Sequence, residues 1–257
     1  MSQRINNVFD RAFHKRVLRR WTKAVERAQA ADLSTLRKMR SRAREIRRRV
    51  DEVLHIADAR LTLPLIGTNA IVKPLHSDWA WRPQIWRGPV SPPGIAAVQT
   101  KSTLGGEVTV FHDCRISELT FRQIRNTREE DLAPFGLRMD VFRFDGSFLS
   151  LAIDLPPEAV AGLQRRHLMR LSMVIEMEQP LEIFARLNVK HGPNTEQIVR
   201  ELPLNEVEVM VEFDLAYTNM NEKRVERAWI DLIFESPEMN QIVLRDLTVA
   251  RRPRAEV

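Results

Sequence analysis

Two groups of side chains have residue types and spacing that suit nucleophilic or acid–base chemistry. The first is the run Phe111-His112-Asp113-Cys114, in which a thiol follows an imidazole by two residues. Because alternate residues of a strand share a face, Cys114 and His112 could act as a nucleophile and its base. A lone cysteine is also a common buried residue, so the same run fits a core position beside a turn.

The second group is a set of carboxylates, Glu212, Asp214 and Asp231. The alternating pattern places them on the outward side of two strands that we expect to be neighbours. Glycoside hydrolysis uses two carboxyl groups about 5–10 Å apart, so a hydrolase or lyase is one hypothesis. The alternatives are contacts to a ligand, or charge pairs with Arg186 and Lys190 across the strands.

The motifs of most cofactor and metal enzymes are missing from the sequence. No glycine run matches a phosphate loop or a dinucleotide fingerprint, and no His-Glu-x-x-His motif occurs. The six histidines are scattered, and a single cysteine excludes a thiol-rich zinc site or an internal disulfide. We therefore expect no cofactor, no metal and no catalytic residue set, and we favour a non-enzymatic function.

The outward positions of residues 181–190, 207–217 and 225–234 mix aromatic, amide and charged side chains. The candidate ligand-binding residues are Phe184, Arg186, Asn188, Lys190, Glu212, Asp214, Trp229 and Asp231. A plain solvent face would not need Phe184 and Trp229, so either another part of the chain covers this face or a ligand binds there. In the second case a sugar would stack on Trp229 and hydrogen-bond with Arg186, Asn188 and Asp231.

These positions belong to segments in which apolar residues recur at every second position. Val207, Val209, Val211, Phe213 and Leu215 show the pattern most clearly, which indicates strands with one face in a core. The same pattern and the intervening turn residues predict strands over 95–99, 107–112, 119–125, 137–144, 148–154, 168–177, 181–189, 195–202, 207–217, 225–234 and 242–249. This organisation predicts a mainly β fold, a two-sheet antiparallel β-sandwich that is jelly-roll-like.

The N-terminal segment differs from the rest of the chain in charge. Residues 1–60 carry 17 basic and 7 acidic side chains, a balance of +10, whereas residues 61–257 carry 23 basic and 27 acidic ones, a balance of −4. Apolar spacings of three and four residues predict two helices joined near Asp32 as a basic helical hairpin. Its predicted basic surface comprises Arg16, Arg19, Arg20, Arg40, Arg44, Arg47 and Arg48.

The chain is expected to divide into three parts. Residues 1–60 form the basic helical hairpin, residues 61–94 form a Pro- and Trp-rich extended arm, and residues 95–257 form the sandwich domain. No secretory leader and no apolar run long enough for a transmembrane segment is present, so we expect a cytoplasmic protein. Phe9, Phe13 and Trp21 stand among the cations of the first helix, which suits attachment to the inner membrane.

Four stretches of the chain carry a resemblance to an uncharacterised family of alphaproteobacterial proteins. They are residues 133–151, 187–197, 229–237 and 244–256, which begin with Ala133-Pro-Phe-Gly, Leu187-Asn-Val-Lys, Trp229-Ile-Asp-Leu and Leu244-Arg-Asp-Leu. This resemblance implies a bacterial source and no particular activity. In addition, the strand expected near Ile242–Arg252 looks like the last strand of galactose-binding-like carbohydrate modules.

Three functional hypotheses remain open. The first is a non-catalytic binding protein whose sandwich recognises a glycan or a protein, with the basic hairpin as a tether or docking element. The second is a peripheral membrane or nucleic-acid-associated protein that acts through residues 1–60, with a purely structural sandwich; the aromatic residues there rank lipid above nucleic acid. The third is the glycan-active hydrolase or lyase.

Overall fold

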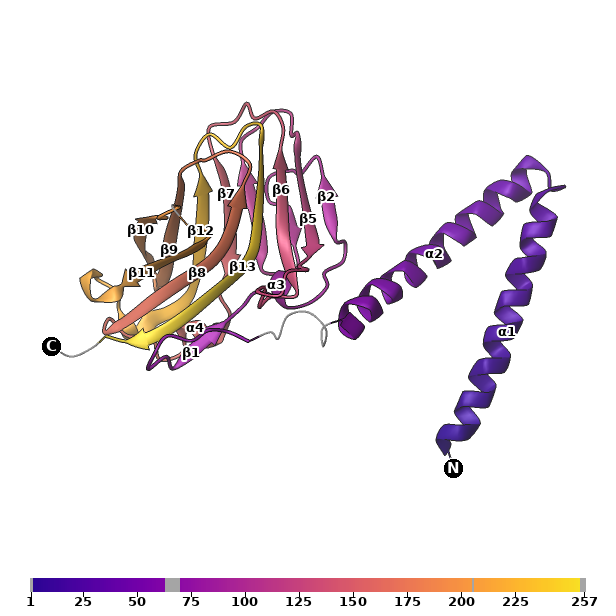
Figure 1. Cartoon of the computed structure of the whole chain (residues 1–257), viewed down its shortest axis with the longest axis horizontal. Helices are drawn as coiled ribbons and strands as arrows, with labels where there is room; N and C mark the ends of the chain where they lie inside the picture. Colours follow the sequence, from indigo (N-terminus) through magenta and orange to yellow (C-terminus); the bar gives the residue numbers. More distant parts are fainter. Residues whose placement is uncertain (1, 63–69, 205, 255–257) are drawn as a thin grey trace. The chain divides into compact units, whose positions relative to one another are not determined.

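The computed structural model describes residues 2–62, 70–204 and 206–254, with side chains described for 14–54, 56–57, 70–204 and 206–254. The chain divides into two compact units, residues 1–55 and 56–257, both drawn in Figure 1. The side chains of Phe9 and Phe13, and residues 63–69 of the predicted arm, lie outside these described parts.

The N-terminal unit is built from two helices with a short link between them. Helix α1 spans Ser2–Ala28 and α2 spans Leu33–Thr62. The Asp32 carboxylate caps α2, because it accepts hydrogen bonds from the backbone N–H groups of Ser34 (2.9 Å) and Thr35 (3.0 Å). Hydrogen bonding from Ser34 and Thr35 holds the pKa of the Asp32 carboxyl well below its usual range.

The two helices meet near the link through small and apolar side chains. The half-buried residues here are Trp21, Ala24, Ala28, Leu36, Met39 and Ala43. They border a hollow of about 280 Å³. Farther along α2, Ile46, Val50 and Val53 are 45%, 49% and 64% exposed. The apolar seam that the sequence predicts along α2 is therefore covered near the link and exposed beyond it.

The second unit is a sandwich of two antiparallel sheets, here named sheet A and sheet B. Sheet A has the order β11-β8-β13-β6-β5-β2, and β1 also pairs with β13. Its strands are β1 (Trp79–Trp81), β2 (Gly94–Ala96), β5 (Leu119–Arg125), β6 (Phe135–Val141), β8 (His167–Met177), β11 (Glu208–Asp214) and β13 (Asn240–Pro253).

Sheet B has the order β10-β9-β12-β7-β4-β3. Its strands are β3 (Thr103–Leu104), β4 (Val108–His112), β7 (Leu149–Asp154), β9 (Ile183–His191), β10 (Asn194–Glu201) and β12 (Val225–Phe234). Short helical turns occupy some of the connections: α3 (Gln84–Arg87), α4 (Pro157–Val160), η1 (Leu215–Tyr217) and η2 (Glu222–Arg224). The predicted fold class, a two-sheet antiparallel sandwich preceded by helices, is confirmed.

The core lies between the two sheets and follows directly from the alternation. Along β8, Met169, Leu171 and Met173 are at most 3% exposed, and Leu187 and Val189 of β9 are 1% exposed on the other side of the core. The intervening residues of each strand face outward, as the period of two requires. The sequence pattern thus separates inward from outward positions in both sheets.

The Trp-rich segment is part of the sandwich unit. Strand β1 pairs with the end of β13, with Trp79 opposite Arg251 and Trp81 opposite Val249. Trp86 in α3 is fully buried, and its indole Nε1 donates a hydrogen bond to the Leu244 carbonyl at 2.8 Å. A buried indole N–H needs such a partner, so Trp86 anchors the segment to β13.

One predicted strand extends too far. The sequence pattern predicts a strand over 207–217, but β11 ends at Asp214. The Asp214 carboxylate accepts a hydrogen bond from the Ala216 N–H at 2.9 Å and thereby begins the turn η1. Leu215 and Tyr217 fit the alternating sequence pattern, but they lie in the turn η1 and not in a strand.

Candidate functional site

The outer face of sheet B carries a polar network on the neighbouring strands β10, β9 and β12. The Asp231 Oδ2 on β12 accepts hydrogen bonds from Arg186 Nε (3.0 Å), Arg186 Nη2 (2.8 Å) and Asn188 Nδ2 (2.9 Å). Gln197 on β10 donates from its amide to Asn188 Oδ1 at 3.0 Å. Strands β10, β9 and β12 are neighbours, so pairing brings these side chains onto two adjacent rows, one with Gln197 and Asn188 and one with Arg186 and Asp231. The charge-assisted bonds hold a carboxylate that is 6% exposed.

An aromatic side chain adjoins this network. Trp229 lies directly opposite Asn188 in the β9–β12 register and is half-buried. The guanidinium carbon of the exposed Arg227 lies 4.8 Å from the centroid of the Trp229 ring, a cation–π contact. Phe184 stands farther along the same face, opposite Ile233. The face therefore combines an oriented indole with fixed hydrogen-bonding groups.

Burial divides the predicted residues of this face into two roles. Asn188 is fully buried and Asp231 nearly so, and both are engaged within the network. The Arg186 side chain is 35% exposed, and Lys190 pairs with Glu226 at 2.7 Å. A hydrogen bond from Lys190 lowers the pKa of Glu226. Arg186, Lys190 and Trp229 are thus partly exposed, whereas Asn188 and Asp231 are enclosed, and Asp231 holds the Arg186 guanidinium.

The structure places two of the predicted site residues elsewhere. Glu212 and Asp214 belong to β11, which pairs with β8 in sheet A and not with β12. The prediction that they share a face with Asp231 is therefore wrong. The chain crosses from sheet B to sheet A between β10 and β11, and both sheets bury alternate residues in the same core. Alternation reveals which side of a strand faces inward but not the sheet to which it belongs.

Glu212 and Asp214 form ion pairs within sheet A. Glu212 Oε1 accepts hydrogen bonds from Arg170 Nε at 2.9 Å and from Arg252 Nη2 at 3.2 Å. Asp214 lies 3.4 Å from the Arg254 guanidinium. Because Asp231 is in the other sheet, these carboxylates do not form the facing pair that glycoside hydrolysis requires.

The His112 imidazole is hydrogen-bonded to backbone groups. Its Nε2 lies 2.9 Å from the Val98 carbonyl oxygen, and its Nδ1 accepts a hydrogen bond from the Cys114 backbone N–H at 3.2 Å. Nε2 therefore carries the proton and donates it to the carbonyl. Burial raises the pKa of the Cys114 thiol. The geometry does not place His112 to take the proton of that thiol.

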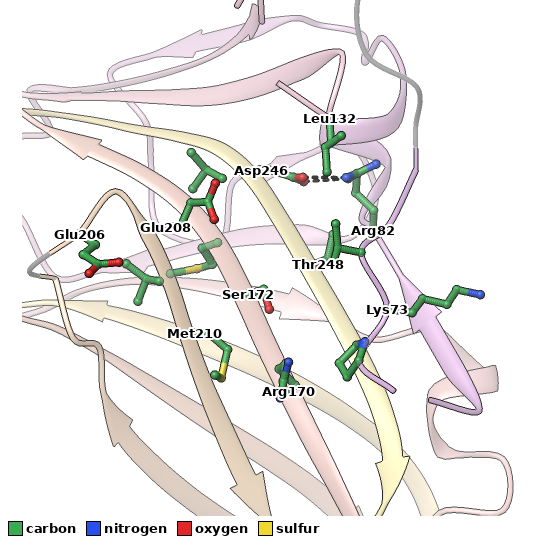
Figure 2. A pocket seen from close by; sticks show the side chains of 15 residues that line it. Lys73, Arg82, Leu132, Arg170, Ser172, Glu206, Glu208, Met210, Asp246 and Thr248 are labelled. Carbon is green, nitrogen blue, oxygen red and sulfur yellow. Dashed lines mark hydrogen bonds and ion pairs between the residues drawn. The ribbon is translucent and has the colours of Figure 1, made fainter. Parts of the chain in front are cut away.

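The sequence did not predict a hollow of about 550 Å³ on the outer face of sheet A (Figure 2). At its floor, Ser172 of β8 lies between Met210 of β11 and Thr248 of β13 in the strand register. Lys73 and the loop residue Leu132 are among the residues that line its walls. The side chains of Ser172 and Thr248 are small and lie beside longer ones such as Met210, so the hollow above them stays unfilled.

Ion pairs lie at two borders of the hollow. The Arg82 side chain is 1% exposed, and its Nε and Nη2 each donate to the Asp246 carboxylate at 2.7 Å, as Figure 2 shows. The second ion pair joins Arg170 to Glu212. Because both guanidinium groups are neutralised by carboxylates, the hollow presents a mixed polar surface rather than a strong field of one sign.

A family model matches residues 1–257, the whole chain, and its description is "Family of unknown function (DUF6478)". The chain belongs to DUF6478. The bacterial source implied by the resemblance in the sequence stays a prediction. A search of curated proteins returns no match for this DUF6478 chain.

Solved structures with some similarity to the DUF6478 chain include carbohydrate-binding modules. The family 11 carbohydrate-binding module of cellulase Lic26A-Cel5E of Clostridium thermocellum is 10% identical over 64% of this chain and 96% of that module, with a TM-score of 0.39. The CBM22-1 xylan-binding domain from Paenibacillus barcinonensis Xyn10C is 8% identical over 72% of this chain and all of that domain, with a TM-score of 0.36.

A third similar structure is much longer than the matched part. The enzymatically active domain of bacteriophage CBA120 tailspike protein 4 is 10% identical over 62% of this chain, with a TM-score of 0.39, and the match spans 21% of that structure. With TM-scores below 0.5, these similarities do not bear on the ligand of the DUF6478 chain.

The predicted basic residues lie on the two helices of the DUF6478 chain. Arg16, Arg19 and Arg20 are exposed on α1, and Arg40, Arg44, Arg47 and Arg48 are exposed on α2. Among the described residues, no helix is both long and apolar enough to cross a membrane. Within the same described parts, His, Cys, Asp and Glu side chains form no group of three or more suited to a metal ion.

Proposed function

We propose that the sandwich of this DUF6478 protein is a non-catalytic module that binds a glycan on the outer face of sheet B. The observation that carries this proposal is the Arg186–Asp231–Asn188–Gln197 network directly beside the half-buried Trp229. It supplies an aromatic surface and oriented hydrogen-bonding groups within one strand register.

Sugars suit such a surface because of their two-sided chemistry. The C–H face of a pyranose ring packs against an aromatic face, while its equatorial hydroxyls reach polar groups at the ring edge. Trp229 supplies the aromatic surface, and Arg186 supplies N–H donors on the neighbouring strand. The Arg227 guanidinium lies over the Trp229 ring, so the sugar displaces it from the ring face and accepts hydrogen bonds from it at the ring edge.

The network also reduces the cost of binding. Arg186 is held by two hydrogen bonds to one carboxylate oxygen, so its side chain is ordered before a ligand arrives. Ordering a flexible side chain costs about 0.5–1.5 kcal/mol on binding, and preorganisation removes most of that cost. Asn188 and Asp231 act in this proposal as positioning residues beneath the ligand.

The first test is a glycan array with the full chain, followed by calorimetric titration of any glycan that is retained. Trp229→Ala should weaken binding by about 1–3 kcal/mol, roughly 5- to 150-fold in Kd, because the aromatic contact is lost. Phe142→Ala is the matched control, since Phe142 is 52% exposed outside this face. That control should bind like the parent chain.

A third variant separates this face from the hollow on sheet A. Ser172→Trp places a large ring over the floor of that hollow and should leave glycan binding unchanged. If Ser172→Trp abolishes binding while Trp229→Ala retains it, the ligand lies on sheet A and the proposed face is wrong. A full array without any retained glycan would contradict the glycan proposal itself.

A further inference from the structure

Helix α2 presents a continuous apolar face that extends beyond its contact with α1. At about 100° per residue, seven of its apolar residues fall within an arc of about 100°, whereas Leu33 and Ile56 lie outside it. The seven are Leu36, Met39, Ala43, Ile46, Val50, Val53 and Leu54. Leu36, Met39 and Ala43 lie against α1, but Ile46, Val50, Val53 and Leu54 are 45–64% exposed. An exposed apolar row of this length marks an interaction surface.

Cations border this face on both sides. The same helical rotation places Arg40, Arg44 and Arg47 along one border and Lys38, Arg42 and Arg49 along the other. The ion pairs Arg47–Asp51 (3.2 Å) and Arg49–Glu52 (2.9 Å) are largely exposed, so they hold these cations weakly. Arginines at the borders can lay their aliphatic stems along an apolar layer and keep their charges in water.

We propose that α2 binds an anionic lipid surface, lying in the plane of the headgroups with the Ile46–Val50–Val53 face toward the acyl chains. The partner is identified by charge complementarity together with the apolar row. Residues 1–60 carry 17 basic and 7 acidic side chains. A leaflet of anionic lipids neutralises such an excess and also buries the apolar face.

Other occupants satisfy only one of these two features. A nucleic acid neutralises the arginines but leaves Ile46, Val50 and Val53 in water. A second copy of α2 covers the apolar row but brings two strongly basic surfaces together, and like charges repel. The lipid surface accounts for both features, and it does not depend on what the sandwich binds.

The test is flotation of the full chain with two kinds of vesicle, phosphatidylcholine alone and phosphatidylcholine mixed with phosphatidylglycerol. We expect flotation only with the anionic vesicles, falling as salt is raised because salt screens the arginines. Arg40→Gln, Arg42→Gln and Arg44→Gln combined should lower the partition coefficient on the order of 100-fold, at about fivefold per arginine. The matched control removes Arg115, Arg143 and Arg166 from the sandwich surface and should float like the parent.

A second variant tests the apolar face separately from charge. Ile46→Ser, Val50→Ser and Val53→Ser combined retain every arginine and should also lose flotation. Equal flotation of this variant and the parent would show that charge alone is responsible and would overturn the proposed orientation.

Equal flotation with both vesicle types, or with neither, would overturn the lipid proposal. Two further outcomes would do the same and would point to another partner: a dimer of the parent chain that the serine variant abolishes, or salt-sensitive binding to a DNA duplex without flotation. Far-ultraviolet circular dichroism, which measures the helix content contributed by α1 and α2, checks that each variant keeps its helices.

Discussion

At the scale of single residues, burial decides what a predicted side chain does. Asn188 and Trp229 lie opposite each other on neighbouring strands, yet Asn188 is fully buried and Trp229 is only half-buried. Both were predicted to touch a ligand, but only Trp229 and its exposed neighbours are accessible. The buried amide instead joins Gln197 to Asp231 and holds the two rows in place.

The same argument applies to the single thiol. Burial raises the pKa of Cys114, so less of it is thiolate at neutral pH than in a free cysteine. We expect iodoacetamide to label Cys114 slowly in the folded protein, with a rate that rises with pH beyond the ordinary thiol value of 9.0. Mass spectrometry of the alkylated chain measures this rate. A rate that already reaches its plateau near neutral pH would instead indicate an activated nucleophile.

At the scale of secondary-structure elements, a β-bulge in β13 determines which residues of this strand face the core of the sandwich. The register of β13 against β8 shifts between Leu244 and Asp246, so Arg245 is the extra residue. Ile242 and Leu244 face the core before the shift, and Leu247 and Val249 face it afterwards. The shift turns Asp246 outward, where it pairs with Arg82 beside the hollow of sheet A.

Two residues support the bulge from β5 and β6. The amide of the fully buried Asn126, next to the end of β5, donates hydrogen bonds to the Arg245 carbonyl and the Ala133 carbonyl, both at 2.8 Å. Gly136 in β6 lies so close that an added Cβ would stand 3.0 Å from the Leu244 carbonyl oxygen and from Asn126 Oδ1. The absence of a side chain at Gly136 permits this approach.

We therefore predict that Gly136→Ala destabilises the sandwich by about 1–3 kcal/mol through overpacking. Gly88→Ala is the control, because its added Cβ would meet only the flexible end of the Gln84 side chain. The midpoint of urea unfolding measures both variants. Equal midpoints for the two variants would show that the bulge tolerates a side chain and that its packing is looser than the structure indicates.

At the scale of the whole molecule, one buried and one half-buried titratable group couple folding to pH. Burial, together with the Arg251 guanidinium, lowers the pKa of His167 below its ordinary value of 6.5. Burial alone would raise the pKa of Glu176, but hydrogen bonds from Arg245 and Arg128 outweigh it and lower that pKa below 4.5. In both cases the unfolded chain takes up a proton at a higher pH than the folded chain does.

The free energy of unfolding should therefore fall in two stages as the pH is lowered. His167 contributes to the free energy of unfolding above about pH 6.5. This contribution is lost as the pH falls toward the lower pKa of His167 in the folded chain. Glu176 contributes to the free energy of unfolding above about pH 4.5. This contribution is lost as the pH falls toward the lower pKa of Glu176 in the folded chain. Urea unfolding at a series of pH values measures both stages.

His167→Asn tests the first stage. The amide oxygen of asparagine can replace His167 Nδ1 as the acceptor for the Gln164 N–H, which lies 2.9 Å away. The variant cannot titrate, so its stability should stay flat where that of the parent begins to fall. An identical decline in parent and variant would assign the first stage to another group.

The sequence by itself determined most of the strands, their inward faces and the basic character of the helices, but not the short strands β1 and β3 or the end of β11. Hydrophobic alternation is local, so Met169, Leu171 and Met173 could be assigned to a core without knowledge of their partners. The start of the second helix near Asp32 was equally predictable, because a capping side chain accepts hydrogen bonds from backbone N–H groups within three residues.

Only the tertiary structure decided which strands share a sheet and where hollows lie. Glu212 and Asp231 have the same outward register in the sequence, but the crossing between β10 and β11 places them in different sheets. The hollow over Ser172 depends on Lys73 and Leu132, which are distant in sequence from its floor. Strand pairing and side-chain approach are long-range contacts, and a period of two contains no information about the partner.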